Sequence, residues 1–469
     1  AFLLVCVVSA VLAQIHFNYV HPATGRPIEI TNMLSGKALV DLMSKMVTNY
    51  ANFPPLSMVI VATLGIGIAD GSGYINTGLK KILSITPKVL ITPVVILVGM
   101  LSHLGPDSGY VIIIPIAAYM FYAVGKHPLA GIAASFAGIA GAFAANYTPS
   151  AIDPVIQGFT QSAAQIIDPG YQVNVLCNYF YAFASTFIVI GACWWVTEKI
   201  TNPWLWKACP LDDDLDLGNE NNSSITPSEN RAFKIATAVL LLMLTGLAAA
   251  LYPADSILRA PDGVIASFKA PIMQSIVSLI FIFAALVGLV YGIACGKFKS
   301  PKDVTAAMEE ITKTLVQLIV FYFFAAQFLY AFGASNMGAL IAVSGAEFLK
   351  SLNLPPQVTV FGIIVFVALL NLIITSASAK WAILAPVFIP MMMLMGYDPA
   401  VTQVVYRIGD SITNPLSPLF TYMPVILGYA RKYDSKAGLG TIIANMLPFS
   451  ITFAVVWIVQ VIIWVGMNL

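Results

Sequence analysis

The sequence predicts an all-α polytopic membrane protein, with nine transmembrane helices plus two re-entrant hairpins in inverted-topology repeats and with broken helices at mid-membrane. Three observations support this fold class: the composition, an internal repeat, and polar breaks inside apolar segments. Of the 469 residues, 59% are hydrophobic and 10% are charged, and the mean hydropathy is +0.85. Soluble domains carry about a quarter charged residues, so this composition indicates a chain embedded in a lipid bilayer.

The internal repeat joins residues 105–129 (GPDSGYVIIIPIAAYMFYAVGKHPL) to residues 376–400 (SASAKWAILAPVFIPMMMLMGYDPA). Five of the 25 aligned positions are identical. Each copy is followed by an apolar segment with a polar, proline-rich break, NYTPSAIDP at 146–154 and SITNPLSP at 411–418. Paired hydrophobic segments that are interrupted at corresponding positions are typical of secondary transporters.

Apolar stretches long enough to cross about 30 Å of hydrocarbon account for seven spans. They lie near residues 1–19, 55–76, 171–196, 232–252, 271–294, 308–334 and 438–467. The segments 88–104 and 108–125 are bounded by Lys88 and Lys126, so both ends return to one side as a re-entrant hairpin. Segments 357–375 and 382–397 form the matching hairpin, and the broken spans 129–166 and 400–428 complete the nine.

These segments divide the chain into five parts. They are an N-terminal scaffold with a periplasmic interfacial loop (1–87), a first repeat (88–196, with its hairpin at 88–125), a cytoplasmic acidic linker (197–231), further scaffold helices (232–356) and a second repeat (357–469, with its hairpin at 357–397).

The distribution of basic residues predicts the orientation. With these spans, 15 of the 23 Lys and Arg residues fall on one side of the membrane, and this side should be cytoplasmic. The two hairpins then open to opposite sides, which makes the repeats inverted. The outer loop 20–54 holds three basic residues and looks amphipathic, so we expect an interfacial helix there. The net charge of +1 and the absence of a basic stripe give no indication of nucleic-acid binding.

Prolines at the two breaks indicate where the chemistry lies. Pro149, Pro154, Pro415 and Pro418 remove backbone donors and stop helices inside the membrane, and the freed backbone groups require a polar cavity. The N-terminus of a half-helix can hold a carboxylate, while carbonyl, amide and hydroxyl oxygens can coordinate a cation. An anionic solute with a coupling cation fits both properties.

Carboxylates at membrane depth are the strongest candidates for the coupling site, because burying them is costly unless they serve an ion or proton path. Asp153 and Asp410 are such residues, and Asn371 and Asn414 add amide oxygens for a hard cation. Sodium at Asp153, Asn371 and Asp410, or a proton, is therefore the predicted coupling ion, and no other cofactor is expected. Two alternatives remain: Arg407, three residues before Asp410, could form a structural ion pair with it, and the amides could cap the backbone.

Substrate candidates lie at the second hairpin tip and at the breaks. Ser378, Lys380 and Trp381 offer a hydroxyl, a cation and an aromatic platform, which suit a ligand with a carboxylate and a ring. A plain anchoring role for Trp381 is the alternative. The other candidates for substrate binding and transport are Asn146, Ser150, Pro399, Arg407, Asp410 and Pro418. The first tip offers His103, Asp107, Ser108 and Tyr110. His103 and Asp107 could relay protons, and a local hydrogen-bonded turn is the alternative.

At these residues the chain resembles the p-aminobenzoyl-glutamate transporter (AbgT) family over nearly its whole length. The resemblance is carried by ANFPPLSMVIVATLGIGIADGSG, SHLGPDSGYVIIIP, KHPLAGIAASFAG, AIDP, SASAKWA, APVFIPM and YRIGDSITN. It implies a homodimer that moves p-aminobenzoyl-glutamate or related folate fragments, with some members resembling exporters of sulfonamide antimetabolites. It singles out Asp153, Ser378, Trp381, Pro399, Arg407, Asp410 and Pro418 as transport residues. Asp70 departs from the family, in which Glu is more usual.

The resulting hypothesis is a cation-coupled transporter of the bacterial inner membrane, not an enzyme, in which the hairpins and broken helices move against a scaffold. Lys380 and Arg407 would hold the carboxylates of an anionic aromatic substrate, with Trp381 against its ring. The alternatives are a transporter of another dicarboxylate or organic anion, and an ion channel. An intramembrane aspartyl protease is disfavoured, because Arg407 and Ile408 stand where its motif needs a glycine.

Overall fold

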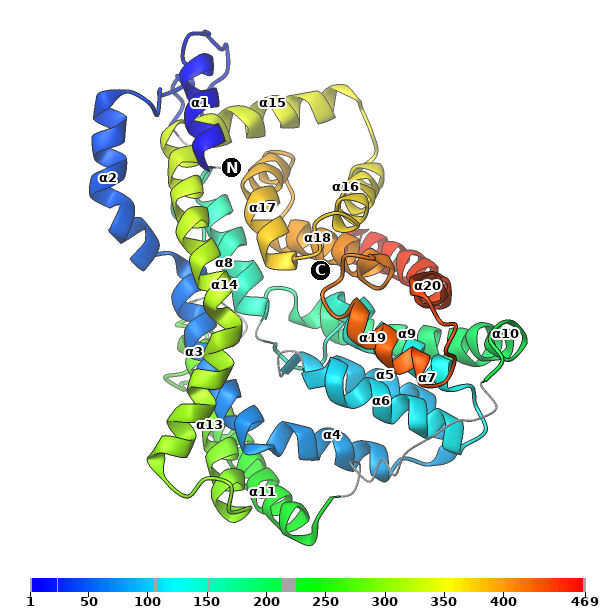
Figure 1. Ribbon diagram of the computed structural model, residues 1–469. Coiled ribbons are helices and arrows are strands. Elements are labelled where there is room, and N and C mark those ends of the chain that lie inside the picture. Colours follow the sequence, from blue (N-terminus) through cyan, green and yellow to red (C-terminus); the bar gives the residue numbers. More distant parts are fainter. Residues whose placement is uncertain are drawn as a thin grey trace.

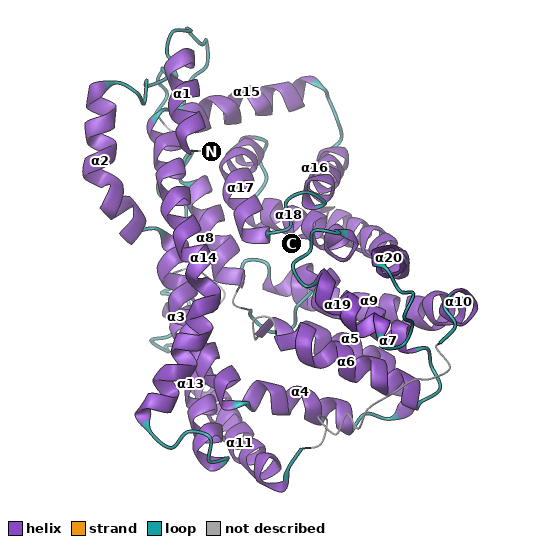
Figure 2. Cartoon of the chain, viewed as in Figure 1, coloured by secondary structure: helices purple, strands orange, loops and turns teal. Residues whose placement is uncertain are grey.

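The computed structural model describes residues 2–22, 24–104, 108–150, 152–211, 225–265, 267 and 269–466. These residues form helices joined by loops and contain no β-strand, which confirms the all-α class (Figure 2). Seven described helices are long and apolar enough to cross a membrane, or eight if the bent pair Tyr74–Ser84 and Lys88–Leu101 counts as one span. One of the seven, Ala377–Leu394, is an arm of the predicted second hairpin, whereas the described residues of the predicted first span (1–19) contain only the short helix Phe2–Leu12.

Four long helices form a column along one side of the molecule (Figure 1). They are α3 (Pro54–Ser72), α11 (Pro227–Leu251), α13 (Ile276–Ala294) and α14 (Pro301–Ala334). Within this column α3 packs against α13 and α14. A glycine, Gly288 of α13, permits the close approach of α13 to α3. Any larger residue there would place its Cβ 2.5 Å from the backbone nitrogen of Ala69, which is too close. The column corresponds to part of the predicted scaffold.

Two helices at the N-terminal end pack against α14: α1 (Phe2–Leu12) and α2 (Gly36–Ala51). The second is the amphipathic helix expected in the loop 20–54, with Ser35 capping its N-terminus. Helices α4 (Tyr74–Ser84), α10 (Asn202–Ala208), α12 (Pro271–Gln274) and α15 (Met337–Ser351) connect the larger elements.

The two repeats contain the predicted hairpins and breaks. The first consists of α5 (Ile91–Leu101), α6 (Ser108–Ala123), α7 (Pro128–Ile139), α8 (Ile152–Ala164) and α9 (Tyr179–Val196). The second consists of α16 (Pro356–Asn371), α17 (Ala377–Leu394), α18 (Pro399–Thr413), α19 (Met423–Arg431) and α20 (Leu439–Gly466). At 1.5 Å per residue the 12 residues of α7 span about 18 Å, so half-helices of this length cannot cross the hydrocarbon alone.

The same turn leads from hairpin to broken helix in both repeats. Gly125 and Gly396 adopt φ angles of 78° and 90°, a left-handed conformation that glycine adopts without steric cost. Two residues later a side chain caps the next helix: His127 Nδ1 accepts from the Leu129 N–H at 3.2 Å, and Asp398 Oδ1 accepts from the Ala400 N–H at 2.7 Å. A proline then occupies the first helical position of α7 and of α18.

Packing between the repeats follows the inverted arrangement. Each hairpin contacts the first half of its own broken helix, since α5 and α6 pack on α7 while α16 and α17 pack on α18. Each hairpin also contacts the second half of the other broken helix, because α19 packs on α6 and α8 packs on α17. The closing helices α9 and α20 pack on each other. The repeats therefore interlock.

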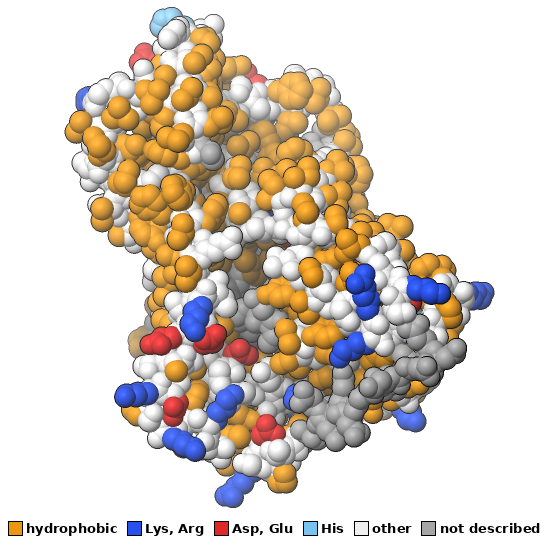
Figure 3. Space-filling model, in the orientation of Figure 1, with side chains coloured by type: hydrophobic (Ala, Val, Ile, Leu, Met, Phe, Trp, Pro, Cys, Tyr) orange, Lys and Arg blue, Asp and Glu red, His pale blue; other side chains and the backbone are white. Residues whose placement is uncertain are grey.

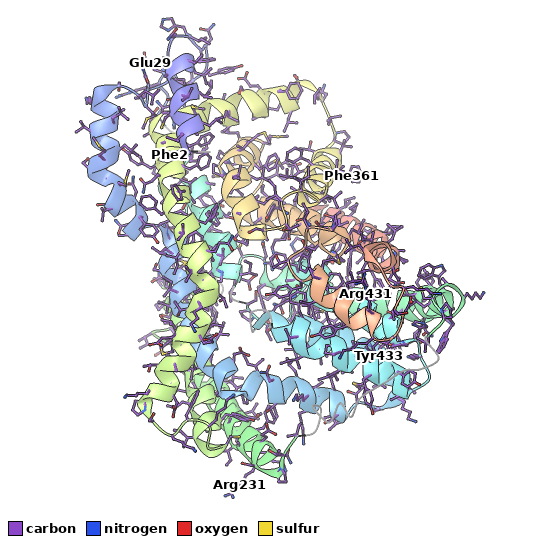
Figure 4. All side chains as sticks on the ribbon, in the orientation of Figure 1. Phe2, Glu29, Arg231, Phe361, Arg431 and Tyr433 are labelled. Atoms are coloured by element: carbon purple, nitrogen blue, oxygen red, sulfur yellow. The ribbon has the colours of Figure 1, made fainter. Side chains whose placement is uncertain are left out.

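Two residues that were predicted to lie on opposite sides of the membrane lie at opposite ends of the molecule. Arg231, on the predicted cytoplasmic side, and Glu29, in the predicted outer loop, lie at opposite ends of the molecule (Figure 4). On the face shown in Figure 3, most charged side chains lie in the lower half, around α11 and α13 and toward α19, whereas the upper half is largely hydrophobic.

Candidate functional site

An ion pair in the interior joins the two repeats, between α18 and the start of α8. Arg407 of α18 donates from Nη1 to Asp153 Oδ1 of α8 at 2.7 Å, and from Nη2 to the carbonyl of Phe143 at 3.0 Å. The Arg407 side chain is 3% exposed and that of Asp153 14%. Arg407 therefore pairs with Asp153 of the other repeat, and the alternative pairing with Asp410 on its own helix is wrong.

Asp153 also organises the start of α8. Its Oδ2 accepts from the backbone N–H of Ser150 at 2.7 Å and from the Ser150 hydroxyl at 3.0 Å. Both carboxylate oxygens are thus engaged, one by the arginine and one by the helix start. Asn146 accepts from the backbone N–H and the hydroxyl of Thr148 at 3.3 Å, and it lines a space of about 10 Å³ beside Asp153 and Arg407. A space of that size accommodates about one water.

Asp410 has a different cation as its partner. The ammonium of Lys380 on α17 lies 2.5 Å from Asp410 Oδ1, and both side chains are completely buried. The same ammonium donates to Asn371 Oδ1, at the end of α16, and to the carbonyl of Ile374 at 3.2 Å. Lys380 therefore ties the two arms of the second hairpin to the broken helix α18.

Two amides complete the Asp410 cluster. The amide nitrogen of Asn371 donates to the Asp410 carbonyl at 2.7 Å and to Asn414 Oδ1 at 2.9 Å. The amide nitrogen of Asn414 in turn donates to Asp410 Oδ2 at 3.1 Å. The structure thus brings together Asn371, Lys380, Asp410 and Asn414, four residues predicted from sequence, in one hydrogen-bonded group.

Trp381 lies in the protein interior beside this group. Its ring is fully buried and stacks on Tyr406, with ring centroids 4.3 Å apart, and its Nε1 donates to the Thr160 hydroxyl at 2.9 Å. The remaining predicted residues are dispersed: Pro399 begins α18, Pro418 is exposed at the end of the second break, and the Ser378 hydroxyl lies 3.4 Å from that of Ser376.

A chain of buried polar residues was not predicted from sequence. Thr160 donates to Gln403 Oε1 at 2.6 Å, and Gln403 donates to Asn178 Oδ1 at 2.7 Å. Together with Trp381 they join both repeats. The available signal was the spacing of Gln403 and Arg407, which are four residues apart and hence on one face of the helix.

A cavity of about 310 Å³ lies between the first repeat and the column. Its walls come from α3, α14, the first hairpin, the first break and the start of α8. His103, Tyr110 and Phe143 supply rings to the lining, and His103 Nε2 hydrogen-bonds the Ile139 carbonyl at 2.7 Å. The cavity reaches Ile152, next to Asp153, whereas Lys380 and Trp381 do not line it. Asp107, another candidate at this tip, lies outside the described residues.

No described His, Cys, Asp and Glu residues gather in a group of three that could hold a metal ion. The cluster around Asp410 offers a different set of oxygen atoms: one carboxylate, the side-chain amides and a backbone carbonyl.

The model of the AbgT putative transporter family matches residues 1–469. The chain belongs to this family. It is 32% identical over 460 residues to the p-aminobenzoyl-glutamate transport protein of Escherichia coli K12, covering 98% of this chain and 89% of that protein.

Two solved structures of transporters have the same fold as this AbgT family member. The YdaH transporter of Alcanivorax borkumensis matches with a TM-score of 0.93 and 38% identity, over 100% of this chain and 97% of that one. MtrF of Neisseria gonorrhoeae, whose structure is described as illuminating a class of antimetabolite efflux pumps, matches with a TM-score of 0.91 and 39% identity, over 99% and 94%. These relatives are named as transporters rather than as enzymes.

Proposed function

We propose that this protein is a cation-coupled secondary transporter of p-aminobenzoyl-glutamate and related folate catabolites in the bacterial inner membrane. The observation that carries the proposal is the Arg407–Asp153 pair, which joins the two repeats next to Phe143 and Ile152 of the cavity wall. The name of the Escherichia coli relative supports the substrate.

The chemistry of the site suits such a substrate. p-Aminobenzoyl-glutamate carries two carboxylates and one aromatic ring. Tyr110 and Phe143 in the cavity would contact the ring, and the guanidinium of Arg407 would hold a carboxylate in a two-pronged contact. The N-terminus of α8 adds partial positive charge near the same point. Lys380 and Trp381 would reach the substrate only after the second hairpin moves, because both are fully buried.

Coupling would arise from competition for the two carboxylates. Asp153 holds Arg407 and Asp410 holds Lys380. A sodium ion or proton that binds Asp153 weakens its attraction to Arg407 and frees the guanidinium for the substrate carboxylate. Substrate and cation would then bind together, which is the requirement for coupled movement.

Movement would follow an elevator scheme. The hairpins and broken helices (α5–α8 and α16–α19) would form a transport unit that slides against the remaining spans. The transport unit and the scaffold are in close contact where α8 meets α3. A Cβ on Gly158 of α8 would lie 2.7 Å from Pro55 Cγ of α3. A homodimer would hold the scaffold fixed in the bilayer.

Sulfonamide antimetabolites are the second proposed substrate class. They share the p-amino-substituted benzene ring of p-aminobenzoyl-glutamate, and MtrF supports export by a member of this family. For these compounds the aromatic side chains that line the cavity would contribute most of the binding free energy.

Transport is tested with purified protein in liposomes and labelled p-aminobenzoyl-glutamate. Flux is measured under a sodium gradient, under a proton gradient and without a gradient. We expect saturable flux that one of the gradients accelerates. Equal flux under all three conditions would exclude coupling, and no flux would exclude this substrate.

A further inference from the structure

The tip of the first hairpin presents a histidine to the cavity between the first repeat and the column. His103 lies in the short turn Ser102–Leu104 at the end of α5, and its ring lines this cavity. The neighbouring Ser102 fixes the turn, because its hydroxyl donates to the Gly99 carbonyl at 2.6 Å. A Cβ on Gly109 of α6 would overlap the same hydroxyl, so the two arms of the hairpin are in close contact beside His103.

The broken helix α7 determines which ring nitrogen of His103 carries the hydrogen. Nε2 hydrogen-bonds the carbonyl of Ile139, the last residue of α7, at 2.7 Å. A carbonyl oxygen only accepts hydrogen bonds, so in the neutral ring Nε2 donates and Nδ1 is an acceptor. Among the described residues, Ile139 alone hydrogen-bonds this ring. Nδ1 is therefore left as an acceptor on a side chain that lines the cavity.

Three side chains follow one another from the ion pair to the hairpin tip. The guanidinium carbon of Arg407 lies 5.5 Å from the ring centroid of Phe143, and the ring centroids of Phe143 and His103 are 6.4 Å apart. The Phe143 carbonyl also accepts from Arg407 at 3.0 Å. The protein thus offers a cation, an aromatic ring and a hydrogen-bond acceptor, and the aromatic ring neighbours both of the others.

The proposed substrate has complementary groups in the same order. In p-aminobenzoyl-glutamate the carboxylates lie at one end, the benzene ring in the middle and the amino group at the far end. An amino group on a benzene ring donates hydrogen bonds and accepts them poorly, because its lone pair is delocalised into the ring. When Arg407 holds a carboxylate and the benzene ring contacts Phe143, the amino group lies toward His103.

We propose that His103 determines substrate specificity, because its Nδ1 accepts a hydrogen bond from the p-amino group of the substrate. The inference rests on the proposed function, from which it takes the substrate and its contact with Arg407. It adds one rule: a compound with a hydrogen-bond donor in the para position binds more tightly than a compound of the same shape without one.

The test measures binding to purified full-length protein in detergent by isothermal titration calorimetry. The ligands are p-aminobenzoyl-glutamate and p-methylbenzoyl-glutamate, in which a methyl group of similar size replaces the amino group. The titrations are made at about pH 8, where a histidine with the ordinary pKa of about 6.5 is neutral. We expect the wild type to prefer the amino compound.

Two variants locate this preference. H103Q lacks the Nδ1 acceptor, although its amide can still donate to the Ile139 carbonyl. We expect the ratio of the two affinities to fall about fivefold in H103Q, which is the usual contribution of one hydrogen bond. T314V is the matched control, since Thr314 of α14 lines the same cavity from the column and should leave the ratio unchanged.

The results separate this inference from the proposed function. If the wild type bound both compounds with equal affinity, the inference would be overturned and the proposed substrate would stand. An unchanged ratio in H103Q, or an equal fall in H103Q and T314V, would also overturn it. If neither compound bound the wild type, the proposed substrate would be wrong and the role of His103 with it.

Discussion

Arg407 of the second repeat and Asp153 of the first are joined by a 2.7 Å hydrogen bond between Nη1 and Oδ1, although 254 residues separate them in the chain. The bond joins the interior of α18 to the start of α8, at the end of the first break. It therefore links the two inverted repeats at the point where the substrate and the coupling ion are proposed to bind.

Neutralising one member of this pair should damage both stability and transport. D153N leaves the Arg407 guanidinium in the interior without its carboxylate, which costs about 3 kcal/mol. We expect a lower unfolding temperature and at least a tenfold loss of flux. The double variant D153N/R407Q should recover part of the unfolding temperature but no flux. Normal flux in D153N would show that the pair has no part in transport.

Trp381 should tolerate an aromatic replacement better than truncation. W381A removes a fully buried ring that stacks on Tyr406, and such truncations cost about 3–5 kcal/mol. W381F keeps a ring there and loses the hydrogen bond to Thr160, which is worth about 1 kcal/mol. Chemical unfolding of both variants measures the difference. Equal destabilisation would contradict the packing described for this side chain.

The first hairpin depends on close helix contact at Gly138. A Cβ at this position would lie 2.5 Å from the carbonyl oxygen of Ile96, so G138A must push α7 away from α5. We expect a clear fall in the unfolding temperature and reduced flux. Gly191 of α9 provides the matched control, since a Cβ there meets nothing within 4 Å. G191A should be neutral or slightly stabilising, because alanine favours the helix; a similar loss in both variants would refute the close-contact explanation.

A cross-link between α3 and α8 should stop an elevator motion. Pro55 and Gly158 lie in contact across the proposed sliding surface, so the pair P55C/G158C is placed to form a disulfide. The five native cysteines are first replaced, and flux is compared after oxidation and after reduction. Oxidation should abolish flux and reduction should restore it. Full flux in protein that is shown to be cross-linked would mean that α8 does not slide along α3.

The fold could be predicted largely from the sequence, because prolines and polar residues inside apolar segments have few structural solutions in a membrane. The turn at Gly125 and Gly396 is an example, since glycine, a capping residue and proline follow in the same order in both repeats. The helices α4 and α15 were not predicted as separate elements, because neither stands out as a full-length apolar stretch.

The candidate site was predicted in its residues but not in its pairing. Asp153, Arg407 and Asp410 stand out because each is charged within an apolar segment. Sequence spacing favoured Arg407 with Asp410, three residues apart, but tertiary packing places Asp153 of α8 against the guanidinium and Lys380 against Asp410. The sequence does not reveal which segments meet at a break, so it could not determine these partners.

The most direct test of the central claim is the accumulation of labelled p-aminobenzoyl-glutamate in liposomes under an imposed cation gradient. A secondary transporter should concentrate the compound above its outside level, and an ionophore that collapses the gradient should release the excess. If the compound reached only the outside concentration whether or not a gradient was present, and the same bilayers conducted ions, the protein would be a channel and the account would be wrong.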